Sequence, residues 1–208
     1  MDHCCADDAT APRSLALVRV LWIVLIANGA MFFVEAAFAF AAGSSALQAD
    51  SIDFFGDAVT YGVSLYVAQR SLRQRAGAGL AKGLMMGALG LAAIGVTVLR
   101  LVSPGVPEAI TIGAVGTLAL VVNLACAAAL YRYRHGDSNM RSVWLCSRND
   151  AIGNLAVIAA AVGVFGLGSA LPDLAVGAAL AALQLSTAAS VIRQAVGELR
   201  PAGAAGAA

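Results

Sequence analysis

Residues 46–57 read ALQADSIDFFGD, and their three aspartates recur at helical spacing inside a chain that is otherwise largely hydrocarbon. Asp50, Asp53 and Asp57 follow one another by three and then four residues, which places them on one face of a helix. A carboxylate at the depth of a lipid bilayer is costly, so it marks an ion path or a proton relay by default. This stretch predicts a membrane helix with an acidic face, in a protein that moves a cation across a membrane.

The overall composition predicts the same class of protein. Of the 208 residues, 60% are hydrophobic and 12% are charged, and apolar runs recur along the whole length, which is more than a soluble domain needs. The net charge of +1 gives no reason to expect nucleic-acid binding, so the lipid bilayer is the expected partner. The sequence contains no phosphate-binding loop and no Ser/His/Asp-type arrangement, so we expect neither an enzyme nor a cofactor.

Six apolar runs are each about long enough to cross ~30 Å of hydrocarbon as a helix. They cover residues 17–41, 46–69, 83–102, 109–130, 143–167 and 171–191. The sequence therefore predicts an all-α fold, a bundle of six transmembrane helices.

Lysine and arginine residues gather at one side of these runs, and only Arg100 falls on the other side. The positive-inside rule then predicts that the N and C termini are both cytoplasmic. Residues 1–13 lack the basic start and the cleavage site of a signal peptide, so we expect the first run to remain as a span. The expected location is a bacterial-type inner (plasma) membrane, with the chain crossing it several times.

The chain is expected to have three parts, a cytoplasmic tail at 1–13, a transmembrane cation transporter domain at 14–197 and a short flexible tail at 198–208. The first tail contains His3, Cys4 and Cys5, which are suited to capture a soft metal ion and pass it to a transport site. A disordered tail without that role explains the same composition equally well.

Two pairs of polar residues on different helices have the spacing of metal ligands. Asp53 and Asp57 are four residues apart on the second helix, and Cys146 and Asp150 repeat that spacing on the fifth. Counted at about 1.5 Å per residue, the two pairs lie at nearly the same depth, close to the middle of the bilayer. Three carboxylates and one thiolate suit a tetrahedral, zinc-like divalent ion. Such a site should hold protons when it is empty and release them when metal binds, which is the chemistry of a proton-coupled antiporter.

With these motifs the chain resembles the cation diffusion facilitator family, whose members export zinc, cadmium, cobalt, iron or manganese from the cytoplasm in exchange for protons. The resemblance rests on ADSIDFFGD at 49–57 and CSRNDAIGN at 146–154, and it covers all six helices. Asn28, Glu35 and Asp173 add to it. The resemblance implies a divalent metal ion as transported substrate, and protons as the counter-ion.

The chain departs from the family pattern at two places. Cys146 stands where the family usually has His or Asp, which shifts the expected substrate toward softer ions such as cadmium, lead or zinc. After Arg200 only residues 201–208 follow, too few for the cytoplasmic domain that family members commonly carry. We therefore expect a short form without that domain, with any homodimer held by its membrane helices.

Several further polar residues fall inside the apolar runs. Asp50, Glu35 and Asn154 are candidates for an accessory role or a proton relay, although Glu35 is equally suited to bond a neighbouring helix. Asn123 and Asn154 are expected to form hydrogen bonds between helices, and Cys126 is expected to pack as a small apolar residue.

Two other functions are compatible with parts of the sequence. A proton-coupled exporter of small organic cations would need an aromatic-lined pocket, but only 6% of residues are aromatic, with Phe54 and Phe55 alone near the site. A non-transporting membrane sensor would bind metal through His3, Cys4 and Cys5, and it would leave the acidic residues at mid-membrane unexplained. Truncation of the first eight residues would abolish a sensor's metal response and leave transport intact.

Overall fold

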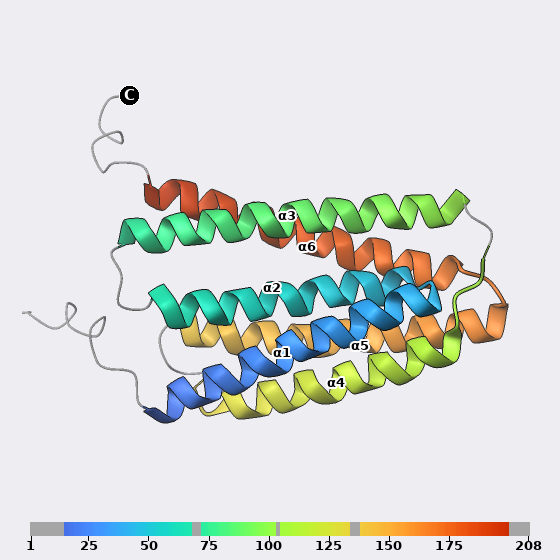
Figure 1. The fold of residues 1–208 in the computed structure, drawn as a ribbon, viewed down its shortest axis with the longest axis horizontal. Helices are drawn as coiled ribbons and strands as arrows, with labels where there is room; N and C mark the ends of the chain where they lie inside the picture. The colour runs from blue at the N-terminus through green and yellow to red at the C-terminus, as the bar shows by residue number, and fades with distance from the viewer. Residues whose placement is uncertain (1–14, 68–71, 103–104, 134–137, 200–208) are drawn as a thin grey trace, which may run out of the picture.

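The computed structural model describes residues 15–67, 72–102, 105–133 and 138–199, and in these ranges the chain forms six α-helices and no strand. The helices are α1 (Leu15–Ala42), α2 (Ser45–Val67), α3 (Leu72–Val102), α4 (Ala109–Tyr131), α5 (Ser138–Leu167) and α6 (Leu171–Leu199). They lie roughly parallel to one another in one elongated bundle (Figure 1). The predicted six-helix, all-α fold is confirmed.

The bundle has two distinct ends (Figure 1). At one end, here the loop end, short connections join α1 to α2 and α5 to α6. At the other, here the terminal end, α1 begins and α6 finishes. Because each helix crosses the whole bundle, consecutive helices run antiparallel.

The exterior of the bundle is apolar and its interior contains polar side chains. Five of the six helices are long and apolar enough to cross a membrane, and the exception, α2, is the helix that carries the three aspartates. Large apolar side chains such as Phe33 and Phe165 are exposed, whereas Glu35, Asn123 and Asn154 are buried. This distribution suits a protein surrounded by lipid, in which polar groups must find partners between the helices.

Three helices extend well beyond the predicted runs, and the other boundaries differ by at most two residues. Helix α3 begins at Leu72 instead of residue 83, α5 begins at Ser138 instead of residue 143, and α6 continues to Leu199 instead of residue 191. All three extensions lie at the terminal end and contain polar and basic residues. The sequence prediction counted only apolar residues, but a helix continues past the hydrocarbon wherever its backbone hydrogen bonds remain satisfied.

Helices α1, α2, α4 and α5 pack together, and α3 packs mainly against α6 at their side (Figure 1). Glycines bring α3 and α6 close together. A Cβ atom at Gly83 would lie 2.7 Å from a side-chain carbon of Ile192, and one at Gly90 would lie 3.0 Å from Leu185. Small residues therefore set this helix–helix distance, as is common within membranes.

The start of α2 is fixed by a carboxylate from α6. Asp173 accepts hydrogen bonds from the Ser44 hydroxyl at 2.5 Å and from the backbone N–H groups of Ser45 at 2.6 Å and Ala46 at 3.2 Å. The two N–H groups are among those that a helix N-terminus leaves without an intrahelical partner. Gly177 allows the close approach, since a Cβ atom there would lie 2.7 Å from the backbone carbon of Ser45. Helix α6 thus holds the helix that carries the three aspartates.

Candidate functional site

The acidic face of α2 meets α5 in the middle of the bundle. Asp57 is 12 residues after the start of α2 at Ser45, about 18 Å along the helix. Its carboxyl group lies within hydrogen-bonding reach of that of Asp150 on α5, and both residues are half-buried. The prediction that these two positions share one depth is confirmed. Asp53 is also half-buried and lies one turn of α2 closer to the loop end.

A tyrosine that the sequence analysis missed supports Asp57. The Tyr61 hydroxyl donates a hydrogen bond to Oδ2 of Asp57 at 3.1 Å, and it lies 3.0 Å from Oγ of Ser147 on α5. Tyr61 is only 1% exposed. Tyr61 follows Asp57 by four residues and lies on the same helical face, so the sequence spacing already indicated that the two side chains could contact each other. The pairing with Ser147 required the tertiary structure.

A lysine on α3 is the second group that the sequence analysis did not place at the site. Lys82 is half-buried, donates a hydrogen bond to the Thr60 hydroxyl on α2, and acts electrostatically on Asp57. From the sequence, Lys82 was interpreted only as one of the basic residues that indicate how the protein is oriented in the membrane. Its position means that a fixed positive charge already acts on one carboxylate of the acidic face.

Other predicted ligands lie outside what the structure describes. His3, Cys4 and Cys5 fall outside the described residues. Cys146 lies on α5 four residues before Asp150, but its side chain is not among those described. Among the described residues, no three His, Cys, Asp or Glu side chains gather closely enough to hold one metal ion. The four-ligand set therefore stays a prediction, and the observed core of the site is the pair Asp57 and Asp150.

A second group of polar residues lies closer to the loop end. Asn154 on α5 donates a hydrogen bond from Nδ2 to Oδ2 of Asp50 at 2.6 Å, and it accepts one from Asn123 on α4 at 2.9 Å. Glu35 on α1 faces Asp50. All four side chains are at most 2% exposed. The predicted hydrogen bonding between helices by Asn123 and Asn154 is confirmed.

Cys126 packs as predicted. It is buried in an apolar cluster with Leu21, Val24, Tyr61 and Leu130.

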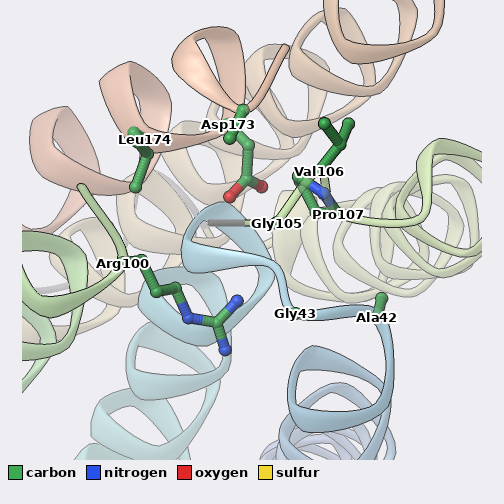
Figure 2. Close-up of a pocket in the computed structure, with 9 residues that line it drawn as sticks. Ala42, Gly43, Arg100, Gly105, Val106, Pro107, Asp173 and Leu174 are labelled. Atoms are coloured by element: carbon green, nitrogen blue, oxygen red, sulfur yellow. The ribbon is translucent and has the colours of Figure 1, made fainter. Parts of the chain in front are cut away.

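A pocket of about 210 Å³ opens at the loop end and is separate from both acidic groups. It is lined by Arg100 from α3, Asp173 from α6 and residues 105–107, among others, and by none of the predicted metal ligands. Figure 2 shows the Arg100 guanidinium and the Asp173 carboxylate on different sides of it. Because Asp173 already accepts three hydrogen bonds from the start of α2, its role here is structural.

A bundle of apolar helices with carboxyl groups facing one another across its centre has the architecture of a multi-pass membrane transporter. Residues 21–200 match the family described as the cation efflux transmembrane domain. The chain therefore belongs to the cation efflux, or cation diffusion facilitator, family, which is a family of cation transporters and not of enzymes. The comparison with curated proteins gives no match.

Proposed function

We propose that this transporter exports a divalent transition-metal or heavy-metal cation, of the zinc, cadmium, lead or cobalt class, in exchange for protons. The observation that carries the proposal is the meeting of Asp57 and Asp150 at mid-bundle, from helices far apart in the sequence. Two carboxylates at this depth attract a cation strongly, because little water is present to screen them.

Asp53, Asp57, Cys146 and Asp150 are the proposed ligands. Cys146 and Asp150 lie one turn apart on α5, as Asp53 and Asp57 do on α2. Each helix would therefore contribute two ligands. Three carboxylate oxygens and one thiolate match the ligand number and softness that a zinc-like ion prefers. We propose His3, Cys4 and Cys5 as a capture site that passes the metal ion to these four ligands.

The exchange follows from competition for the same oxygens. Without metal, the close approach of Asp57 and Asp150 requires a proton between them. A metal ion that enters from the cytoplasm displaces this proton. The metal ion then leaves on the other side of the membrane when a proton returns. The conformation open to the cytoplasm and the one open to the outside must differ in their affinity for the metal ion and for the proton. Only such a difference in affinity shifts the equilibrium between conformations.

Tyr61 and Lys82 would tune this competition. The Tyr61 hydroxyl orients the Asp57 carboxylate by its hydrogen bond. The Lys82 ammonium opposes metal binding at Asp57, since the ammonium and the metal ion are both positively charged.

The distribution of positive charge supports an orientation with the loop end outside. Arg100 is the one lysine or arginine at the loop end among the described residues, whereas Arg19, Arg73, Arg132 and Arg193 lie toward the terminal end. By the positive-inside rule the terminal end faces the cytoplasm. We place the protein in a bacterial-type inner membrane, as a homodimer held by membrane helices.

The test is metal uptake into proteoliposomes with an acidic lumen, measured separately for zinc, cadmium, cobalt and manganese. We expect uptake driven by the pH gradient for the intact chain and its loss in Asp57→Ala. Glu198→Gln is the matched control, because it removes an exposed carboxylate from α6 far from the site and should transport normally. A changed order of metal preference in Cys146→His would place the thiol among the ligands.

Normal metal flux in Asp57→Ala would contradict the proposed site. If a folded wild-type protein carried none of the four metals, the metal-export proposal would fail. Uptake of an organic cation, or a metal response without transport, would then favour one of the two alternative functions.

A further inference from the structure

The pair Glu35 and Asp50 has an unusual environment for two acidic residues. They are 0% and 2% exposed, and their carboxyl groups face each other from α1 and α2. Neither Oε1 nor Oε2 of Glu35 has a hydrogen-bond donor among the described residues. Asp50 receives one hydrogen bond, from the Asn154 amide.

The charged groups that act on Glu35 in the described part of the chain are Asp50 and Asp53, and both are acidic. On the other side of Asp50, Asn154 and Asn123 supply neutral amides. No described cation therefore offsets the charge of two ionised carboxylates in this position. Two like charges held together without water repel each other strongly, whereas one bound proton converts the repulsion into a hydrogen bond between carboxyl and carboxylate.

The pair lies closer to the loop end than the proposed metal ligands. Asp50 is five residues after the start of α2, about 8 Å along the helix, whereas Asp53 is about 12 Å and Asp57 about 18 Å along it. In the proposed orientation, Glu35 and Asp50 therefore lie between the outside and the metal ligands. An incoming proton would reach this pair before it reached Asp57.

We propose that Glu35 and Asp50 share one proton, and that this proton, held apart from the metal ligands, is one that the transporter exchanges for metal. The inference rests on the proposed function, because it assigns a place to one of the exported metal's counter-ions. The proton binds from outside water to a carboxylate oxygen of the pair. It leaves to cytoplasmic water when the O–H bond breaks, so charge and atoms balance without any other reactant.

Asn154 provides a physical link between the pair Glu35 and Asp50 and the proposed metal ligands. It lies one turn after Asp150 on α5 and donates its hydrogen bond to Asp50 on α2. A shift of α5 on metal binding that aligns this amide better with Asp50 would favour the charged form of Asp50. The shared proton would then be released, so metal binding and proton release would be coupled through one amide.

The variant Glu35→Gln tests whether the pair Glu35 and Asp50 carries an exchanged proton or instead binds the metal ion. Glutamine has nearly the same shape, and its amide donates the hydrogen bond that the shared proton would supply, so the variant mimics a permanently protonated pair. We expect metal-for-metal exchange at equal pH, measured with labelled cadmium or zinc, to stay near the wild-type rate. Accumulation driven by the pH gradient should fall, because one exchanged proton is missing, and Asp57→Asn should lose both activities.

Proton release on metal binding gives a second readout. A pH-indicator dye in weakly buffered detergent solution should report about one proton fewer per bound metal ion for Glu35→Gln than for the wild type. Asp50→Asn should behave in the same way and serves as the second variant if Glu35→Gln does not fold. Glu108→Gln, an exposed acid before α4, is the control and should change neither activity.

Two results would overturn the inference. Unchanged pH-driven accumulation and unchanged proton release in the folded variant would show that the pair carries no exchanged proton. Loss of metal-for-metal exchange in the folded variant would make the pair part of the metal site. Absence of metal flux in the wild type is a different outcome, because it would refute the proposed function itself.

Discussion

Asp173→Asn is expected to weaken the hold of α6 on the start of α2. The carboxylate of Asp173 is 1% exposed and accepts three hydrogen bonds, two of them through Oδ1 and one through Oδ2. In the asparagine variant one oxygen becomes an NH₂ group. The least costly arrangement keeps the oxygen toward Ser44 and Ala46 and turns the NH₂ group toward the N–H of Ser45, where two donors face each other.

The magnitude follows from the lost bond and the lost charge. A hydrogen bond to a charged group contributes about 1.5–3 kcal/mol. The interaction of a carboxylate with a helix N-terminus adds about 0.3–1 kcal/mol. The variant should therefore lose about 2–4 kcal/mol of unfolding free energy, a large part of the ~5–15 kcal/mol typical of folded proteins.

The assay is equilibrium unfolding of the purified protein in detergent micelles, followed by the fluorescence of Trp22 and Trp144. Glu198→Gln removes the same charge from an exposed position on the same helix, so it should change the unfolding free energy by less than about 0.5 kcal/mol. The reasoning is refuted if Asp173→Asn is as stable as this control. A larger loss in Asp173→Ala, which leaves all three donors without an acceptor, would support it further.

Four other substitutions test the packing and the site. Gly177→Ala should destabilise the protein by about 1–3 kcal/mol because its Cβ would overlap backbone, whereas Gly95→Ala, with no atom within 4 Å, should be neutral or slightly stabilising; both are read from unfolding in micelles. Tyr61→Phe should weaken metal binding by about 10- to 100-fold in calorimetric titration, since Asp57 loses its hydrogen bond, and unchanged affinity would rule out a supporting role. Lys82→Met should tighten metal binding several-fold in the same titration, because a positive charge that acts on Asp57 is removed; weaker binding would contradict that account.

The depth of the acidic residues was predictable because a helix rises by a fixed distance per residue. Asp57 and Asp150 are separated by much of the sequence, yet counting from the ends of two apolar runs placed them at one level. Their contact in the structure agrees with this count. The ends of α3, α5 and α6 were less predictable, since polar residues at a membrane surface are compatible with both helix and loop.

The partners of each acidic residue were not predictable from spacing alone. Rotation of each helix about its axis decides which neighbour a side chain faces, and that rotation is set by the packing of small residues such as Gly83 and Gly177 against other helices. For this reason the contact between Tyr61 and Ser147 was not predicted. The bond from Asn154 to Asp50 was likewise left open between accessory and packing roles.

The membrane-helix bundle and the shared depth of its carboxylates could be predicted from the sequence, because apolar length and helical period depend only on local chemistry. The hold of Asp173 on α2 and the facing of Glu35 and Asp50 became apparent only from the packing of the helices. Those contacts join α6 to the start of α2 and α1 to α2. They depend on which helices are neighbours and on how each is turned, and no single segment of the sequence contains that information.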